Sequence, residues 1–265
     1  MTKVLFMGRK PVAARCLEQI LTRPDVHVVA VLTDNHLEVS PTSEVARKNN
    51  IPLLRFEEAL EACERGTLSF DFGISMLYWR KLKGALLSKA PRGIVNFHPA
   101  PLPDYKGVGG YNLAILDGLN EWACTAHYVD EEIDTGKIIM IDRFPIDPET
   151  ETARTLEAKS QTALWDLFTT VFDQLVQSGD RLPTSPNKGG RYLNRIELEE
   201  MKRIDLQKDD IARKARAFWF PPYEGAFIEI KGQKFTVVDR SILESLADPS
   251  SSSLFTPSAA PKKSD

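Results

Sequence analysis

Residues 92–107 have the sequence RGIVNFHPAPLPDYKG, and this stretch decides the fold. Its apolar run predicts a β-strand over residues 93–98, with Asn96 and His98 on one face and Phe97 on the other. Pro99 cannot donate a hydrogen bond to a neighbouring strand, so the strand is predicted to end at His98. The two polar side chains are therefore expected at the carboxyl end of a strand, where open parallel sheets bind their ligands.

Short runs rich in valine and isoleucine alternate with helical patterns around this strand. The alternation predicts an α/β protein with a Rossmann-like, mostly parallel sheet and helices on both faces. The other predicted strands are residues 3–7, 26–32, 70–75, 123–129 and 137–144. Helices are predicted over residues 12–21, 43–49, 56–63, 81–89, 110–116 and, as a long amphipathic helix, 152–176.

The chain is expected to contain a main, catalytic domain and a small C-terminal subdomain. The main domain is assigned to residues 1–178, and the linker at 179–190 is dense in turn-forming residues. The subdomain, residues 191–244, is predicted as α+β, with two helices and a β-hairpin around Lys231 and Gly232. Residues 245–265 are rich in serine and proline and are predicted to be disordered.

Composition excludes several classes of function. The formal net charge of −3 provides no global positive field that would attract nucleic acid or an acidic membrane. The three cysteines, Cys16, Cys63 and Cys124, are far apart, which favours free thiols over disulfides or a metal cluster. The sequence shows neither a signal-peptide pattern nor an apolar stretch of membrane-spanning length, so a cytoplasmic protein is expected.

A second polar motif lies in residues 124–137, CTAHYVDEEIDTGK. Here a predicted strand runs into an acidic loop that carries Asp134. If this strand neighbours the one at 93–98, the carboxylate can lie beside His98, orient its imidazole and stabilise a proton on it. Taken singly, Asn96, His98 and Asp134 each have a structural explanation as a strand-end, core or turn residue. His127 is interpreted as a packing residue or as a support for the site.

The sequence NFHPAPLPDYKG, followed by HYVDEEIDTG, resembles the folate-dependent formyltransferase family. The family motif is Asn-x-His, then a leucine-proline turn, then Asp-x-Gly, and both halves match in order and spacing. The resemblance covers roughly residues 1–180 in layout. It implies N10-formyltetrahydrofolate as formyl donor and Asn96, His98 and Asp134 as catalytic residues. The later sequence RAFWFPPYEGAFIEI also looks like the terminal domain of members that act on nucleotide-linked amino sugars.

The implied reaction begins with attack of a neutral amine on the formyl carbon. Asn96 and protonated His98 would donate hydrogen bonds to the resulting oxyanion, each worth about 3 kcal/mol in comparable sites. His98 would then pass a proton to the departing folate nitrogen. Asp134 would hold His98 and raise its pKa, so that the charged form is present near neutral pH. This chemistry needs no metal.

The resemblance also implies where folate binds. The folate should lie between the segment after the strand at 70–75 and the loop before Asp134. The matching positions are Leu77, Tyr78, Lys81, Leu82 and Lys83 on one side and Asp130, Glu131, Glu132 and Ile133 on the other. Lys81 and Lys83 have an equally good explanation as solvated residues at a helix start.

Candidate residues for the acceptor are Arg9, Lys10, Tyr105 and Lys106. Arg9 and Lys10 precede a predicted helix, whose N-terminus favours anions, and could meet a pyrophosphate. Tyr105, with Tyr111 and Trp79, could stack on a base or sugar. Lys106 and Val108 stand where the transfer-RNA-modifying branch carries an arginine-glycine pair and further polar contacts, which weakens the transfer-RNA interpretation. Only one glycine follows the first strand, so a nicotinamide cofactor is disfavoured.

Four acceptors fit the chemistry: a nucleotide-linked amino sugar, initiator methionyl transfer RNA, glycinamide ribonucleotide and water. Residues 180–240 contain thirteen Lys and Arg against ten Asp and Glu, and this net charge of +3 is small for binding a large polyanion. Glycinamide ribonucleotide enzymes usually end soon after the catalytic domain, and water-using relatives are expected to carry a domain ahead of it. The preferred acceptor is a nucleotide-linked amino sugar, such as a dTDP-4-amino-4,6-dideoxyhexose of lipopolysaccharide O-antigen synthesis.

Two alternatives stay open. One is a formyltransferase for methionyl transfer RNA or another amine, and the other is a non-catalytic module that binds folate or a nucleotide. The expected partners are small molecules, with neither nucleic acid nor membrane, and a homodimer is one option for the oligomeric state.

Overall fold

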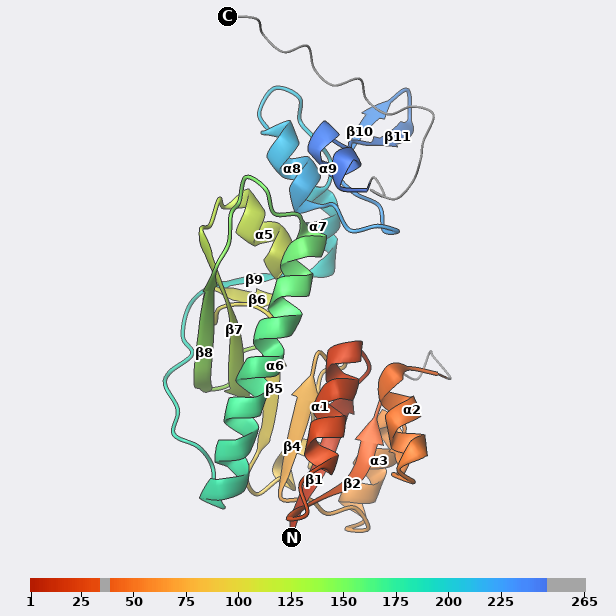
Figure 1. Cartoon of the computed structure of the whole chain (residues 1–265), viewed down its shortest axis with the longest axis vertical. Coiled ribbons are helices and arrows are strands. Elements are labelled where there is room, and N and C mark those ends of the chain that lie inside the picture. Colours follow the sequence, from red (N-terminus) through yellow and green to blue (C-terminus); the bar gives the residue numbers. More distant parts are fainter. Residues whose placement is uncertain (34–38, 247–265) are drawn as a thin grey trace, which may run out of the picture.

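The structure, a computed structural model, describes residues 1–33 and 39–246 and centres on a seven-stranded sheet (Figure 1). The strand order is β3-β2-β1-β4-β5-β7-β8. The first five strands are parallel, and β7 is antiparallel to both of its neighbours. Their bounds are β1 Thr2–Gly8, β2 Val26–Leu32, β3 Leu53–Leu54, β4 Phe72–Met76, β5 Ile94–His98, β7 Glu121–Tyr128 and β8 Ile138–Pro145. The predicted α/β fold with a mostly parallel sheet is confirmed.

Helices cover both faces of the sheet. Alternate residues of β1 enter different cores: Phe6 packs with residues of α1, α2 and α6, whereas Leu5 packs with residues of α3 and α4. This alternation follows from the two-residue repeat of a strand. The helices are α1 Pro11–Leu21, α2 Pro41–Lys48, α3 Phe56–Glu64, α4 Ala85–Ser88, α5 Gly110–Leu116 and α6 Ala153–Ser178.

The predicted helix at 81–89 is wrong in its extent. Only Ala85–Ser88 forms a helix, as α4. Gly84 precedes it with φ of 59°, a left-handed backbone angle that a right-handed helix cannot contain. Lys81, Leu82 and Lys83 therefore belong to the loop between β4 and α4.

The C-terminal subdomain lies at the end of the molecule opposite the N-terminus (Figure 1). It contains the two predicted helices and the predicted hairpin, and its core residues Ile204, Phe218 and Ala226 pack on Ile115 of α5. The elements are α7 Arg195–Met201, α8 Ile211–Ala217, β10 Phe227–Ile230, β11 Gln233–Thr236 and α9 Arg240–Ser245. From residue 247 onward, the tail predicted to be disordered lies outside the described residues.

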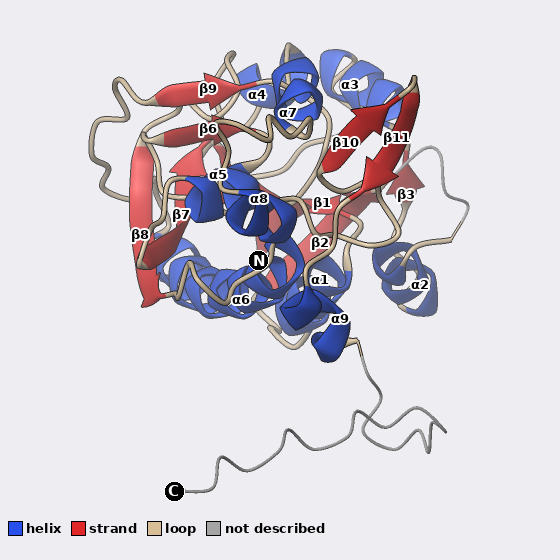
Figure 2. Ribbon diagram, turned by 90° about the horizontal axis from the view of Figure 1, so that it is seen from above, coloured by secondary structure: helices blue, strands red, loops and turns tan. Residues whose placement is uncertain are grey.

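A second small sheet, absent from the sequence-based expectation, joins the two parts. Its strands, β6 (Tyr105–Gly107) and β9 (Arg191–Leu193), are parallel and lie side by side in Figure 2. The residues before β9 are also fixed, because Ser185 and Ile138 of β8 exchange backbone hydrogen bonds. The predicted linker thus packs along the edge of the main sheet.

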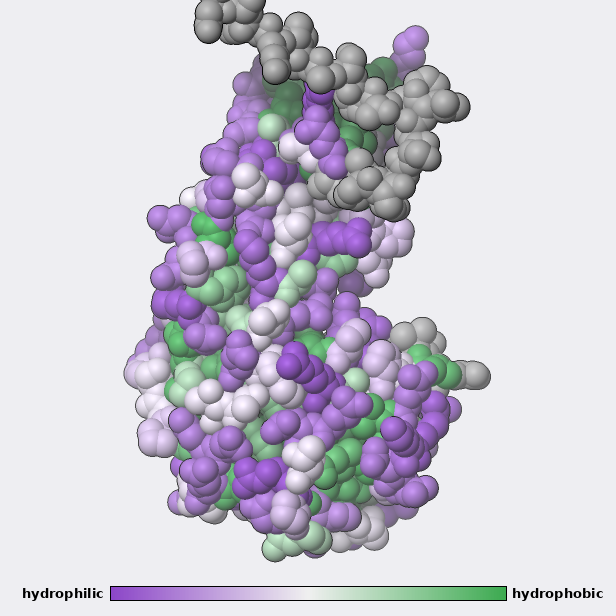
Figure 3. All heavy atoms as spheres, in the orientation of Figure 1, coloured by the Kyte–Doolittle hydropathy of each residue, from purple (hydrophilic) through white to green (hydrophobic). Residues whose placement is uncertain are grey.

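Hydrophilic residues predominate on the face in Figure 3, and hydrophobic patches are scattered between them. Among the helices of residues 1–33 and 39–246, none is both long and apolar enough to cross a membrane. The three cysteines are buried and unbridged, as the sequence predicts.

Candidate active site

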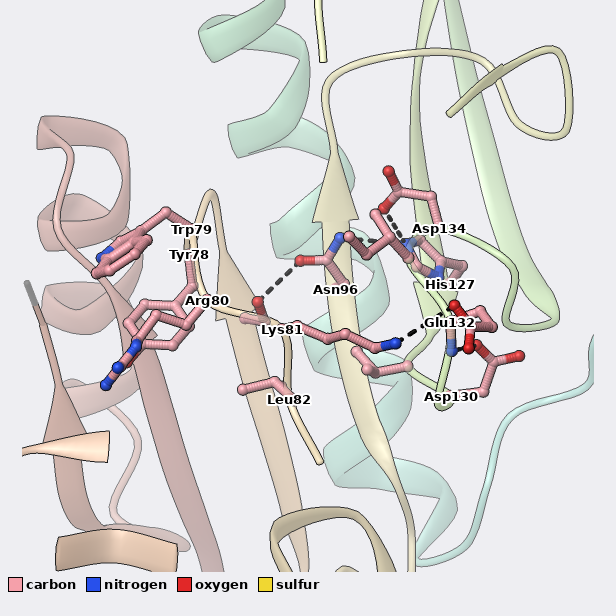
Figure 4. A pocket seen from close by; sticks show the side chains of 13 residues that line it. Tyr78, Trp79, Arg80, Lys81, Leu82, Asn96, His127, Asp130, Glu132 and Asp134 are labelled. Carbon is pink, nitrogen blue, oxygen red and sulfur yellow. Dashed lines mark hydrogen bonds and ion pairs between the residues drawn. The ribbon is translucent and has the colours of Figure 1, made fainter. Parts of the chain in front are cut away.

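The structure brings Asn96, His98 and Asp134 together. Asn96 and His98 come from the last residues of β5, and Asp134 comes from the loop between β7 and β8. His98 Nδ1 lies 3.6 Å from Asp134 Oδ2, and His127 Nε2 lies 3.6 Å from Asp134 Oδ1. Figure 4 shows Asp134 above His127, with Asn96 beside them. The juxtaposition expected from neighbouring strands is therefore present.

The loop reaches this position by folding back on itself. Because β7 is antiparallel to β5, its last residue, Tyr128, pairs with Val95 near the start of β5. Gly136 packs against this strand so closely that a Cβ would lie 1.7 Å from the carbonyl oxygen of Tyr128. The Asn187 side chain donates hydrogen bonds to the carbonyl oxygens of Asp134 and Gly136, at 2.9 and 2.8 Å. Because any side chain at position 136 would collide with the carbonyl of Tyr128, glycine is required there, two residues after Asp134.

The tautomer of His98 follows from its contacts. Nε2 lies 2.8 Å from the carbonyl oxygen of Tyr105, which can only accept, so Nε2 carries a proton and Nδ1 faces Asp134. Burial lowers the pKa of His98, although Asp134 acts to raise it, and His127 lowers it further. Asp134 thus acts in the direction expected from the sequence, but desolvation of the nearly buried ring outweighs it, so the expectation that His98 is charged near neutral pH is wrong.

Asp134 is held as a carboxylate. Its Oδ2 accepts a hydrogen bond of 2.9 Å from the backbone N–H of Gly107. Burial by itself would raise the pKa of Asp134, but His98, His127 and the Gly107 N–H together lower it to about 2. Strand β6 therefore contacts both members of the pair, His98 through Tyr105 and Asp134 through Gly107.

Asn96 is fixed at both ends of its carboxamide. Its Oδ1 accepts a hydrogen bond of 2.8 Å from Ser75 Oγ, and its Nδ2 lies 3.1 Å from His127 Nε2. One of its two amide hydrogens remains available to a ligand. The half-buried side chain borders two cavities.

The small cavity, about 500 Å³ with its open mouth, lies between the loop after β4 and the loop after β7 (Figure 4). Six of the nine residues predicted to bind folate line it: Tyr78, Lys81, Leu82, Asp130, Glu132 and Ile133. Lys81 and Glu132 form an ion pair of 3.3 Å between its two sides. Sequence reasoning missed Arg80 and Val129, and it did not give Ser75 a role; all three line this cavity.

Three of the predicted folate residues lie elsewhere. Leu77 lines the neighbouring cavity. Lys83 and Glu131 are exposed and line neither of the two cavities in the described structure, so their role in folate binding stays a prediction. Their loops turn them towards solvent, which a spacing argument cannot foresee.

The large cavity, about 1650 Å³ with its open mouth, adjoins the small one at Asn96 and Asp134. His98 borders it. The C-terminal part contributes Tyr192, Arg195 and Phe220, and α6 contributes Glu157. Sequence reasoning missed these four because only long-range packing brings them to the end of β5. Tyr111 and Trp79, noted from sequence as stacking candidates, do line this cavity.

The residues predicted to bind the acceptor do not line this cavity in the described part of the chain. Lys10 reaches its border through an ion pair of 3.7 Å with Glu157. Tyr105 Oη donates a 2.9 Å hydrogen bond to Asp117, and Lys106 Nζ donates one of 2.6 Å to the carbonyl of Gly189. Tyr105 and Lys106 thus hold β6 in place. The role of Arg9 in binding the acceptor stays a prediction. Among the described residues no group of three His, Cys, Asp or Glu could hold a metal.

Comparison with known proteins identifies the family. The family model described as formyl transferase matches residues 2–171. The chain belongs to this formyl transferase family. The resemblance drawn from the Asn-x-His and Asp-x-Gly motifs is confirmed, and with it the enzyme class of the chain, a formyltransferase.

Individual relatives differ in their acceptors. The methionyl-tRNA formyltransferase of Clostridium tetani (strain Massachusetts / E88) is 27% identical over 262 residues, which cover 94% of this chain and 83% of the relative. An N-formyltransferase from Helicobacter canadensis, solved with folinic acid and dTDP-3-aminofucose, is 27% identical, with a TM-score of 0.71 over 88% of this chain and 86% of that one. A 4-N formyltransferase from Francisella tularensis, 22% identical, shares the fold, with a TM-score of 0.74 over 89% of this chain and 96% of that one.

Proposed function

We propose that this formyltransferase moves a formyl group from N10-formyltetrahydrofolate to the amine of a nucleotide-linked amino sugar. The observation that carries the proposal is that two cavities meet at Asn96 and Asp134, with His98 beside them. A donor in the small cavity and an acceptor in the large one would place their reacting atoms against the same three side chains. This arrangement is what transfer between two bound molecules requires.

The donor fits the chemistry of the small cavity. Leu82 and Val129 provide apolar walls, and the loop that ends at Asp134 provides backbone groups for the polar edge of a pterin. The Helicobacter canadensis relative was solved with folinic acid, a formylated folate. The lining residues Tyr78, Lys81, Leu82, Asp130, Glu132 and Ile133 are proposed as the folate site.

The lowered pKa of His98 sets the order of proton transfers. As the amine attacks, a C–N bond forms, the carbonyl π pair moves to oxygen, and Asn96 Nδ2 donates a hydrogen bond to that oxygen. Neutral His98 takes the amine proton at Nδ1, where Asp134 stabilises the imidazolium. When the oxygen pair re-forms the carbonyl, the C–N10 bond breaks, the folate nitrogen takes this proton and His98 is neutral again.

The large cavity favours a nucleotide-linked acceptor. Tyr192 and Phe220 offer aromatic faces to a base or sugar, and Arg195 offers a guanidinium to a phosphate. The Helicobacter canadensis relative was solved with dTDP-3-aminofucose, a ligand of this class. A small, soluble acceptor of this kind fits a cytoplasmic enzyme that supplies formylated sugars for surface polysaccharides such as the O-antigen.

Methionyl transfer RNA is the second candidate, because the Clostridium tetani relative carries that name. The distribution of charge argues against it. Of the thirteen Lys and Arg in residues 180–240, nine form ion pairs with acidic side chains. Paired cations leave little net field for a polyanion, whose binding depends on neutralising many phosphates.

The test is to incubate the protein with N10-formyltetrahydrofolate and one acceptor at a time, and to measure tetrahydrofolate release. The proposal expects turnover with a dTDP-linked amino sugar and none above background with methionyl transfer RNA or without acceptor. Turnover with methionyl transfer RNA and with no amino sugar would contradict the proposed acceptor, although formyl transfer itself would still be supported. Folate binding without release, for all amines tried, would favour a binding module.

A further inference from the structure

Ser75 is a buried polar residue in the sheet beside the reacting centre. It lies on β4 directly opposite Asn96 of β5, is 3% exposed, and borders the small cavity. We propose that Ser75 is a positioning residue which, through a hydrogen-bonded chain that ends at His127, fixes the Asn96 carboxamide with one N–H directed at the formyl oxygen. This inference rests on the proposed formyl transfer and assigns a role in it to a side chain that touches neither reactant's reacting atoms.

The direction of the chain starts from a backbone carbonyl. His127 Nδ1 lies 2.8 Å from the carbonyl oxygen of Tyr128, so Nδ1 carries a proton and donates it. In the neutral form this leaves a lone pair on Nε2, which lies 3.1 Å from the Asn96 carboxamide and 3.6 Å from Asp134 Oδ1. The carboxamide atom that meets this lone pair must be the amide nitrogen, because the amide oxygen has no hydrogen to donate. The amide oxygen then points to Ser75 Oγ, which donates a hydrogen bond of 2.8 Å.

Each link has a definite consequence for catalysis. His127 decides which end of the carboxamide is nitrogen, because the opposite orientation would set an oxygen against the Nε2 lone pair. Ser75 holds the oxygen end and prevents it from turning into the cavity, where it would repel the developing oxyanion. Hydrogen bonds in such a chain polarise one another, so donation to Oδ1 also strengthens Nδ2 as a donor.

The first test is the Ser75→Ala variant, which removes one oxygen atom and nothing else. We expect kcat to fall by about tenfold, the loss expected for a misoriented donor and smaller than for its removal. The KM values for folate and acceptor should stay within about twofold, because the effect is confined to the transition state. In an Asn96→Ala background the same substitution should change kcat by less than about twofold.

Ser43→Ala is the matched control, because Ser43 is an equally buried serine whose hydroxyl instead completes the capping box of α2 with Ser40. It should lower the melting temperature and leave kcat unchanged. Ser75→Thr, which keeps the hydroxyl donor, should retain kcat within about threefold if the melting temperature is preserved. Unchanged kcat in Ser75→Ala, or an equal loss in both Asn96 backgrounds, would overturn the inference while wild-type turnover upholds the proposed function.

A second measurement does not depend on turnover. In ¹⁵N-labelled wild-type protein, a scalar coupling across the hydrogen bond should connect Asn96 Nδ2 with His127 Nε2. The coupling should weaken or vanish in Ser75→Ala and persist in Ser43→Ala. Its absence from the wild type, or its full persistence in Ser75→Ala, would contradict the positioning role even if no acceptor were turned over.

Discussion

The reacting centre and the wall of the large cavity are built in different ways. Asn96, His98 and Asp134 lie at the end of a strand and in a tight loop, and backbone or buried side-chain groups fix each of them. Tyr192 and Arg195, by contrast, project from β9 and the start of α7 and are exposed. Under the proposed function, the sheet fixes the chemistry and the C-terminal part selects the acceptor. Substitutions should therefore separate kcat from the KM for acceptor.

Asn96→Ala should have the largest effect. It removes the proposed donor to the oxyanion, so kcat should fall by about 10²–10³-fold. Neither KM should change by more than about threefold, because the hydrogen bond is made mainly in the transition state. Steady-state kinetics would check this, with Asn49→Ala as control, because Asn49 is the C-cap of α2 and lines neither of the two cavities in the described structure. A raised KM for the acceptor with normal kcat would show that Asn96 binds the acceptor and does not take part in the chemical step.

Asp134→Asn should come next, with kcat lowered by about 10²-fold because the imidazolium formed at His98 loses its counter-charge. Its pH profile gives a sharper test. Activity should fall in acid as His98 becomes protonated, with an apparent pKa below the ordinary 6.5, since burial lowers it. Asp134 acts to raise the pKa of His98, so its removal should move this acid limb to still lower pH.

Wild type and variant must be compared with one acceptor, so that the acceptor's own titration cancels. A shift of the acid limb to higher pH in Asp134→Asn would mean that the titrating group is not His98. The carboxylate itself contributes stability above its unfolded pKa, and this contribution is lost only as the pH falls towards about 2.

Phe220→Ala tests the other side of the comparison. Loss of an aromatic face in the large cavity should raise the acceptor KM by about tenfold and leave the folate KM and kcat nearly unchanged. Tyr223→Ala is the matched control, because its ring contacts that of Phe220 at 5.9 Å between centroids yet is 71% exposed and does not line the cavity. Equal effects of the two substitutions on the acceptor KM would contradict the proposal that Phe220 binds the acceptor.

Glu132→Ala should have the smallest effect. The ion pair with Lys81 spans the small cavity, but the side chains are 46% (Lys81) and 75% (Glu132) exposed, and exposed pairs contribute about 0–1 kcal/mol. The folate KM should change by less than about fivefold, which is the upper end of that range. Added salt should reduce even this difference. A large loss of folate affinity that resists salt would show that Glu132 contacts the ligand itself.

The fold and the proposed reacting centre could be predicted from the sequence, because short stretches of neighbouring residues determine them. The alternation in residues 93–98 and the proline after His98 place two polar side chains correctly at a strand end. The motif match adds Asp134. The effect of Asp134 on the pKa of His98 was predicted with the right sign, but the net shift is downward, because the sequence shows a charged neighbour and not the depth of burial.

The residues around the large cavity, the proposed acceptor site, could not be predicted from the sequence, for a physical reason. Tyr105 and Lys106 follow the motif closely in sequence, yet β6 turns them to Asp117 and Gly189. Phe220 reaches the cavity only because the C-terminal part packs on α5. Asn187, which holds the loop of Asp134, lies in a segment predicted as a plain linker. Contacts between segments so far apart leave no periodic pattern in the sequence.

The most direct measurement is tetrahydrofolate release from N10-formyltetrahydrofolate in the presence of a dTDP-linked amino sugar, by wild type and by His98→Ala at the same concentration. Wild type should turn over, and His98→Ala should be slower by about 10³-fold, because the proton can no longer pass from amine to folate nitrogen. Folate binding should be equal for both. Equal rates of release would contradict a transfer centre at His98.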